Sequence, residues 1–418
     1  MQSYIAQAKF MVKPQSFQGG SMKRRHVGFL LLAAAIGLIG LLTVQAQRKA
    51  AQKRTSTRAA QTVYTANYTL SGPHSHNNLS VFLIHGKDIS NGTPPLTLQE
   101  AMAQKKVVVH ETGDVNNLAI ENVSQEEVFV QSGDIVKGGQ QDRVLALDLI
   151  VPPKSGRVPI SSFCVEQGRW SGRGDESARA FSRSEKMLVS KDLKIAAKHK
   201  ASQEEVWDYV GKSQEKLGKG VAVARAISPG VSAGGGGGSG YGTGRAGNAA
   251  GGSITRGESA GTPPPPSYSV ASPQSSSSLQ LTLENKDVQN TAGEYINKLS
   301  SIIEGKNDVI GFAFAINGQI NSADVYSSHA LFKKLWPKLL ESSAVEALGE
   351  LEKDKTYKAV TTEDVAAFLD EPKAGNTDIK EVTPRVRMIK RETEKNLFFE
   401  TSDRKKAGDW IHRNYIKK

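Results

Sequence analysis

The sequence contains almost no cysteine and, over its first sixty residues, no acidic residue. Cys164 is the only cysteine of 418 residues, which excludes an intrachain disulfide and any zinc site built from several cysteines. Residues 1–60 carry ten Lys or Arg residues, so most of the net charge of +12 lies there and the remainder of the chain is nearly neutral. This distribution argues against a broad phosphate-binding face, and we expect no nucleic-acid partner.

A single long hydrophobic run interrupts the basic N-terminal region. It begins at Val27 and ends at Val44, and as an α-helix it would span about 27 Å, close to the hydrocarbon thickness of a bilayer. It therefore predicts one N-terminal hydrophobic helix that contacts the membrane as a single-pass anchor. A buried core helix is an alternative, but the basic clusters on both sides of the run argue against it.

The same run also fits the apolar core of a signal peptide. Basic residues 23–25 precede it, and Ala46 offers a small residue for cleavage, after which the protein would be exported to the periplasm or the extracellular space. The true start could be Met1 or Met22, because Met22 stands just before the basic residues; residues 1–21 would then be a mis-called start. Both interpretations assign residues 22–46 to a signal peptide or membrane anchor and place the protein in the cell envelope.

Composition divides the rest of the chain. Residues 47–75 are expected to form a basic polar spacer. Residues 229–278 contain GGGGG, PPPP and SSSS runs and too few apolar residues to fold, which predicts a disordered Gly/Ser/Pro-rich insertion between residues 76–228 and residues 279–418. The stretch GTGRAG inside this insertion matches the dinucleotide-binding pattern, but no strand precedes it and no helix follows it, so we assign it no function.

The two flanking regions carry the patterns of an α+β fold, and 38% apolar residues suffice for a core. Strands are expected at residues 78–84, 107–110, 117–123, 127–136 and 143–151. The last is expected to pair with residues 157–166 across a Pro-Pro turn. Helices are expected at residues 97–104, within 176–217, at 288–303, from 330 and from 361, with hairpins around Asn317-Gly318 and within 385–403. We therefore predict antiparallel strands and hairpins with segregated helices.

Polar and charged residues crowd the segments that enter and leave the hairpin at the Pro-Pro turn. The residues expected to form a ligand pocket there are Gln141, Asp142, Arg143, Glu166, Arg169 and Trp170. Guanidinium groups bind carboxylates or phosphates through two parallel hydrogen bonds, and an indole face stacks on a base or a sugar. The structural alternative is that arginine–carboxylate pairs close the ends of the hairpin, with Trp170 in the core.

A hydrolase is the second hypothesis. Asp142 and Glu166 lie on neighbouring predicted strands and could act as the acid and the base of a hydrolytic reaction. Cys164 could also pair with His110 or His329, but no sequence signature of a cysteine nucleophile accompanies these residues. A lone thiol is more commonly a small buried apolar group.

No cofactor is indicated, and we expect no metal site. His74 and His76 have no third ligand at a suitable spacing, so we expect a solvated histidine pair. Asp324, Ser328 and His329 follow the Asn-Gly hairpin, where polar residues commonly cap a helix. They could also form a second wall of the ligand pocket.

Four segments of the chain resemble a known family. They are GDIVKGGQQDR, CVEQGRW, GFAFAINGQINSADVYSSHALFKKLW and WIHRNYIKK. Together they resemble the ARG and rhodanese-phosphatase-superfamily-associated protein domain, over residues 76–418. The resemblance implies that the Gly/Ser/Pro tract is an insertion within one domain. The family's biochemistry is undefined, and its name implies a link to nucleotide or ADP-ribose metabolism inside cells. Gln140 stands where the family pattern has Lys, and the hydrophobic leader departs from an intracellular setting.

These features predict an exported or membrane-tethered α+β protein that binds a small anionic or nucleotide-like ligand. One alternative is a hydrolase that uses Asp142 or Glu166. The other is a structural envelope protein without a ligand, in which the Gly-rich tract serves as a loop.

Overall fold

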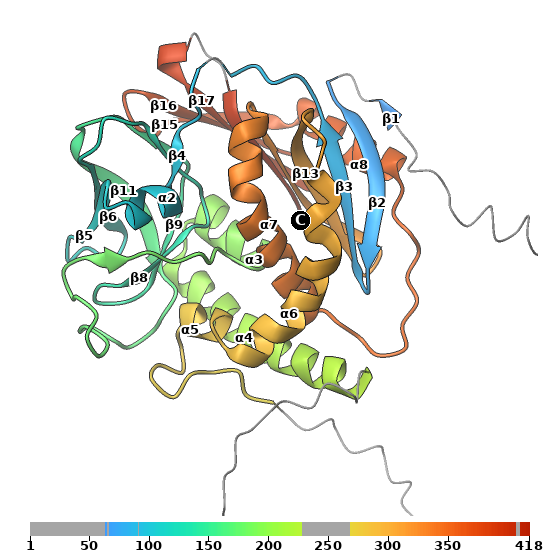
Figure 1. The fold of residues 1–418 in the computed structure, drawn as a ribbon, viewed down its shortest axis with the longest axis horizontal. Coiled ribbons are helices and arrows are strands. Elements are labelled where there is room, and N and C mark those ends of the chain that lie inside the picture. Colours follow the sequence, from blue (N-terminus) through green and yellow to red (C-terminus); the bar gives the residue numbers. More distant parts are fainter. Residues whose placement is uncertain (1–62, 65–66, 91, 228–267, 407–409) are drawn as a thin grey trace, which may run out of the picture. The chain divides into compact units, whose positions relative to one another are not determined.

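Largely antiparallel sheets and helices make up the described part of the chain, which confirms the predicted α+β class (Figure 1). The computed structural model describes residues 63–64, 67–90, 92–227, 268–406 and 410–418. The predicted N-terminal helix and the predicted disordered insertion lie outside these residues, apart from the end of the insertion. No helix within the described residues is long and apolar enough to cross a bilayer.

The largest sheet contains strands from both sides of the Gly/Ser/Pro tract. Its strands, in spatial order, are β1 (Val63–Tyr64), β2 (Thr69–His76), β3 (Leu79–His85), β13 (Val309–Ile316), β14 (Gln319–Tyr326), β18 (Trp410–Lys417), β17 (Asn396–Asp403), β16 (Val386–Glu392) and β15 (Asn376–Glu381). β3 pairs with β13, and every residue of β13 is buried. The spacer predicted over residues 47–75 is therefore too long, because β2 already belongs to the sheet.

The predicted turn at Asn317-Gly318 joins β13 to β14. Asn317 and Gly318 both have positive φ, at 53° and 71°, the backbone that a tight hairpin turn requires. A Cβ at Gly318 would also lie 2.5 Å from the carbonyl oxygen of Lys358, so a larger residue would collide with backbone.

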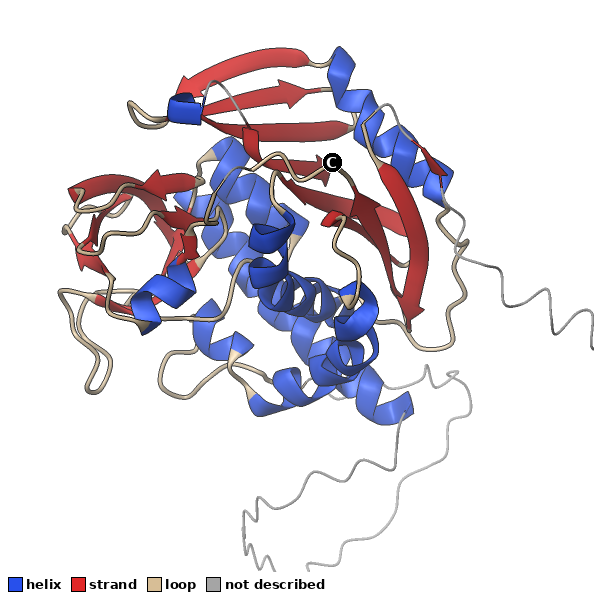
Figure 2. Ribbon diagram, turned by 45° about the horizontal axis from the view of Figure 1, so that its top comes forward, coloured by secondary structure: helices blue, strands red, loops and turns tan. Residues whose placement is uncertain are grey.

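Two smaller sheets form a second β region (Figure 2). One contains, in spatial order, β12 (Phe181–Ser182), β8 (Ile135–Gly138), β9 (Arg143–Leu145), β11 (Gly156–Cys164), β6 (Asn117–Asn122) and β5 (Val107–Glu111). The other contains β10 (Leu149–Val151), β7 (Val128–Val130) and β4 (Leu96–Thr97).

Two strand predictions in this region are wrong. The expected strand at 127–136 is divided into β7 and β8, and that at 143–151 into β9 and β10. Only β9 pairs with β11, because β10 pairs with β7 in the other sheet. Gly133, with a φ of +97°, turns the chain between β7 and β8.

Helices lie between the β regions and on the outer face of the large sheet. They are α2 (Leu98–Ala103), α3 (Lys191–Lys194), α4 (Gln203–Ile227), α5 (Leu279–Leu283), α6 (Lys286–Leu299), α7 (His329–Gly349) and α8 (Thr362–Asp370), with a π-helix at Ile195–Lys200. The helix expected from residue 361 is confirmed as α8, and the structure adds a capping box of Thr361 and Asp364 at its start. The helix expected from residue 176 begins only at Lys191. Pro337 lies in the interior of α7.

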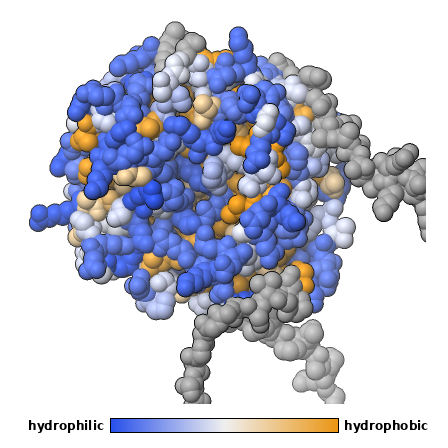
Figure 3. Space-filling view, viewed as in Figure 1, coloured by the Kyte–Doolittle hydropathy of each residue, from blue (hydrophilic) through white to orange (hydrophobic). Residues whose placement is uncertain are grey.

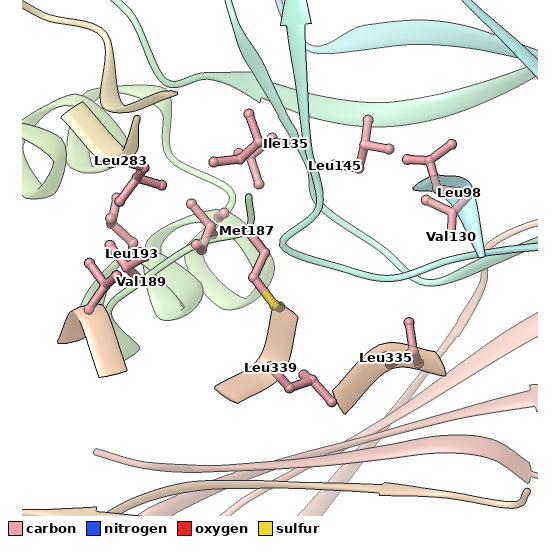
Figure 4. Packing of buried hydrophobic residues seen from close by; sticks show 14 of the residues in the cluster. Leu98, Val130, Ile135, Leu145, Met187, Val189, Leu193, Leu283, Leu335 and Leu339 are labelled. Carbon is pink, nitrogen blue, oxygen red and sulfur yellow. The ribbon is translucent and has the colours of Figure 1, made fainter. Parts of the chain in front are cut away.

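One apolar core joins the smaller β region, the helices and the inner face of the large sheet. Figure 4 shows Leu335 and Leu339 of α7 with Met187, Ile135 and Leu145 in this core. A second cluster fills the space between the other face of the large sheet and α8. The surface in the view of Figure 3 is mostly hydrophilic, with scattered apolar residues.

Candidate functional site

The structure brings together the two segments predicted to form a pocket. Cys164 of β11 is the register partner of Arg143 of β9, so the residues that follow Cys164 run beside those that precede Arg143. The backbone N–H of Val165 donates to the carbonyl of Asp142 at 3.0 Å. The N–H of Asp142 in turn donates to Glu166 Oε2 at 3.0 Å.

Two arginines neutralise the carboxylates of Asp142 and Glu166, which are both fully buried. Arg169 donates to Glu166 through Nε at 2.8 Å and through Nη2 at 2.7 Å. Arg173 donates to Asp142 through Nη1 at 3.0 Å and through Nη2 at 3.2 Å. The Ser278 hydroxyl adds a hydrogen bond of 2.7 Å to Asp142. These contacts form a closed ion-pair network inside the protein.

The pKa of Glu166 reflects these contacts. Burial alone would raise the pKa of this carboxyl, but hydrogen bonds from Arg169, Ser275 and the Asp142 backbone hold it below its usual value. Glu166 is therefore ionised at neutral pH. A general acid of a hydrolase needs a raised pKa, so the environment of Glu166 does not favour that role.

Arg143 occupies a separate buried position. Its Nη1 donates to the carbonyl of Val115 at 2.7 Å and contacts the Cys164 sulfur, and its Nη2 lies 3.5 Å from Glu111 Oε2. Its side chain is completely buried, so a ligand would have to displace protein atoms to reach it.

Cys164 does not have the surroundings of a nucleophile. Burial raises the pKa of its thiol to about 11, so the thiol stays protonated at neutral pH. His110 pairs instead with Glu121 at 2.9 Å, and His329 Nδ1 contacts the carbonyl of Val309 at 2.7 Å. The contacts of these residues do not form a thiol–imidazole pair.

Gln141 and Trp170 differ sharply in exposure. Gln141 is 1% exposed, and neither atom of its amide group has a hydrogen-bond partner in the described structure. Trp170 is 53% exposed, so the structural alternative, which placed it in the core, is wrong on this point. Five cavities in the described part of the chain are lined by none of the six residues predicted to bind a ligand.

Sequence reasoning missed three members of the ion-pair network. Arg173 and Glu176 lie in a loop beyond Trp170, and Arg173 donates to Glu176 at 3.0 Å. Ser278 is the last residue of the predicted insertion and caps α5. The only sequence signal for Arg173 was its closeness to Trp170, and Ser278 was hidden in a run of serines.

A second candidate site is a cleft at the N-terminal end of α7. Its volume is about 350 Å³, within the range of small-molecule sites. Its apolar lining consists of Ile89, Pro94, Pro95, Ile150, Leu331 and Ile411. Its polar and aromatic lining includes Ser90, Ser327, Ser328, Glu127, Asp403, Lys405 and Trp410. Of these residues, sequence reasoning had singled out only Ser328.

Charges in the cleft are unevenly paired. Arg385 pairs with two residues of its lining, with Asp403 at 2.8 Å through Nε and with Glu127 at 2.6 Å through Nη1. The two acidic residues that line the cleft are thereby neutralised. The exposed side chain of Lys405 borders the same space. Trp410 also lines it, and the guanidinium of Arg413 lies over one face of the indole, at 4.1 Å from the ring centroid.

The sequence family described as the ARG and Rhodanese-Phosphatase-superfamily-associated Protein domain matches residues 67–416. The match covers most of the chain, so the protein belongs to this family, as the resemblance of the quoted segments indicated. Neither the curated proteins nor the solved structures include a significant match.

Proposed function

We propose that the protein binds a small anionic, nucleotide-like ligand in the cleft at the start of α7. The observation that carries this proposal is the position of Lys405 and Trp410 at an otherwise largely apolar hollow of about 350 Å³. An indole face accepts a planar ring by stacking, and an ammonium group pairs with a phosphate or carboxylate. The serine hydroxyls of the cleft supply partners for ligand hydroxyl groups.

The proposal moves the ligand away from the residues that the sequence suggested. The guanidinium groups of Arg169 and Arg173 already hold Glu166 and Asp142, so these contacts support a structural role for the predicted segments. Ligand binding at those segments stays a prediction, as does their use in a hydrolase. The proposal also includes export or membrane tethering, which rests on the hydrophobic run from Val27 to Val44.

Calorimetric titration of the full-length chain, purified in detergent, tests the proposal. The probes are AMP, ADP-ribose, adenosine and inorganic phosphate. We expect AMP or ADP-ribose to bind, and Lys405→Ala to weaken binding about tenfold, the effect of losing one charge-assisted hydrogen bond. Lys395→Ala is the matched control, because Lys395 is an exposed lysine just before β17 begins at Asn396, at the end of the strand opposite Asp403.

Arg143→Ala separates the two sites. If it abolished AMP or ADP-ribose binding without lowering the melting temperature, while Lys405→Ala had no effect, the ligand would occupy the site that the sequence suggested. Absence of binding by all four probes would contradict the proposal and favour the structural envelope protein.

A further inference from the structure

A serine, a histidine and an aspartate lie in line at one end of the large sheet. Ser71 Oγ lies 2.7 Å from His85 Nε2, and His85 Nδ1 lies 3.1 Å from Asp308 Oδ1. Each ring nitrogen of His85 therefore has one partner, a hydroxyl on Nε2 and a carboxylate on Nδ1. This is the order of contacts by which a histidine activates a serine nucleophile while an acid fixes its tautomer.

Three neighbouring strands set this arrangement. His85 is opposite Thr69 in the pairing of β2 with β3, so Ser71, two residues beyond Thr69, lies diagonally across from His85. The N–H of Gly86 donates to the carbonyl of Asp308 at 2.9 Å, and His85 is the register partner of Val309. The backbone thus holds Asp308 beside the ring.

A backbone irregularity follows directly after Ser71. The register of β2 against β3 shifts between Ser71 and His74. Gly72 has a φ of +128°, and a Cβ there would lie 3.0 Å from the carbonyl oxygen of Val81. Only glycine fits this position without strain, so the local sequence is adapted to the bend beside Ser71.

The three side chains border an open hollow of about 550 Å³. His74, Lys306, Thr69 and Gly86 complete its lining. The side chain of His85 is 14% exposed and that of Asp308 is 67% exposed. A small substrate could therefore reach Ser71, while the imidazole is largely shielded from water.

Two further groups in this hollow can stabilise negative charge. Lys306 carries an ammonium group, which also donates to the carbonyl of Ile302 at 2.5 Å. Burial, with the charges of Lys306 and His85, lowers the pKa of His74, so His74 is a neutral imidazole with one N–H to donate at neutral pH. Such donors suit a carbonyl oxygen that becomes an oxyanion.

We propose that Ser71, His85 and Asp308 form a serine-hydrolase site for small carboxylic esters. Ser71 Oγ bonds to the ester carbonyl carbon as its proton passes to His85 Nε2. The bond from that carbon to the alcohol oxygen then breaks, and the alcohol leaves with this proton. Water hydrolyses the acyl group from Ser71, releasing a carboxylic acid and restoring the hydroxyl. Asp308 positions His85 and stabilises its charge. This site shares no residue with the cleft at α7, so it is independent of the ligand proposed there.

A fluorophosphonate probe tests the nucleophile directly in the full-length chain. Ser71 Oγ displaces fluoride from phosphorus, and mass spectrometry locates the adduct. We expect an adduct on Ser71 in the wild type and in Ser75→Ala, and none on this residue in Ser71→Ala or His85→Asn. Ser75 is the matched control because it belongs to the same strand and its hydroxyl forms a hydrogen bond with Ser80, at 2.8 Å, rather than with a histidine.

Hydrolysis of p-nitrophenyl acetate gives the second measurement. We expect Ser71→Ala and His85→Asn to lower kcat/KM by at least about a hundredfold, and Asp308→Asn by at least about tenfold. Melting temperatures of all variants identify any that misfold. Labelling of Ser71 in the wild type does not depend on the variants, so it tests the nucleophile even if a variant misfolds. A wild type without an adduct on Ser71, or equal labelling of His85→Asn, would overturn the proposal.

Discussion

His412 lies 2.9 Å from Asp148, measured from Nδ1 to Oδ2, and its other ring nitrogen lies 3.0 Å from Asp324 Oδ1. All three side chains are at most 6% exposed. Asp148 precedes β10 in the smaller β region, whereas Asp324 and His412 lie on adjacent strands of the large sheet. The imidazole therefore links two β regions through a buried ion-pair bridge, with the ring of Tyr326 stacked on it at 4.6 Å.

Replacement of His412 by alanine should strongly destabilise the fold. It would leave Asp148 and Asp324 as neighbouring buried carboxylates without their shared cation, and loss of one partner of a buried pair costs about 3–5 kcal/mol. Urea unfolding measures this change in free energy. His199→Ala is the control, because His199 pairs with Glu392 near the surface at 3.6 Å and should cost about 1 kcal/mol or less. Equal losses in the two variants would contradict the prediction.

The same bridge predicts how stability changes with pH. Burial alone would raise the pKa of both carboxyls. Lys198 and His412 together have a larger effect than burial on Asp148, so its pKa is lowered. The hydrogen bond and charge of His412 lower the pKa of Asp324 in the same way. Burial alone would lower the pKa of His412, but Asp148 and Asp324 raise it. The aspartates therefore add stability above about pH 4 that is lost as the pH falls. His412 adds stability below about pH 6.5 that is lost as the pH rises through its raised pKa.

We expect the contribution of this bridge to be largest between about pH 4 and pH 6.5. Urea unfolding from pH 3 to pH 9 measures the free energy in the wild type and in His412→Ala. The difference between the two proteins should shrink towards both ends of this range. A constant difference would show that the three groups do not titrate as a unit.

Asp142→Asn should destabilise the protein by about 3 kcal/mol, since it removes one of the two buried carboxylates that face Arg173 and leaves the guanidinium with Glu166, at 3.4 Å, and the partly exposed Glu176. Trp170→Ala, in the neighbouring loop, should change stability by about 0.5 kcal/mol or less because its side chain is mostly exposed. Chemical unfolding of both variants measures this. A small loss in Asp142→Asn would indicate that the network is not structural and would favour a ligand there.

Two glycines of α4 should respond oppositely to alanine. A Cβ at Gly220 would lie 1.9 Å from the carbonyl oxygen of Leu348, so Gly220→Ala should force α4 away from α7 and cost about 1–3 kcal/mol. No atom lies within 4 Å of a Cβ at Gly211, so Gly211→Ala should stabilise the helix by about 0.5–1 kcal/mol. Thermal unfolding of both variants measures these changes in stability. Stabilisation by Gly220→Ala would contradict the close packing of α4 against α7.

The sequence predicted elements whose signals are local. The Asn317-Gly318 hairpin and the helix start at residue 361 depend on a few adjacent residues, and both are confirmed. The division of residues 143–151 into two strands was missed because the alternation of side chains along this segment looked continuous. In the structure, Ala146 to Asp148 cross from the sheet that contains β9 to the sheet that contains β10. That choice depends on distant partners, such as β7, which no local pattern reveals.

The site predictions show a similar limit. Crowded polar residues correctly indicated that Gln141 to Arg143 and Glu166 to Arg169 meet, but not that Arg173 would neutralise Asp142. Ser71, His85 and Asp308 carry no motif, because Asp308 is distant in sequence and reaches His85 only through the pairing of β3 with β13. Trp410 and Lys405 likewise join the cleft at α7 only in the folded chain.

The pairing of β3 with β13 also imposes an order on synthesis. β3 is complete at His85, but its partner begins at Val309, so residues 86–308 must be made before the two strands can meet. At about 5–20 residues per second this takes roughly 10–45 s. Throughout that time the β2–β3 hairpin would present the apolar side chains of Val81, Phe82 and Leu83 without the rest of its sheet. Exposed apolar surface and unpaired strand edges make such an intermediate prone to aggregation during this delay.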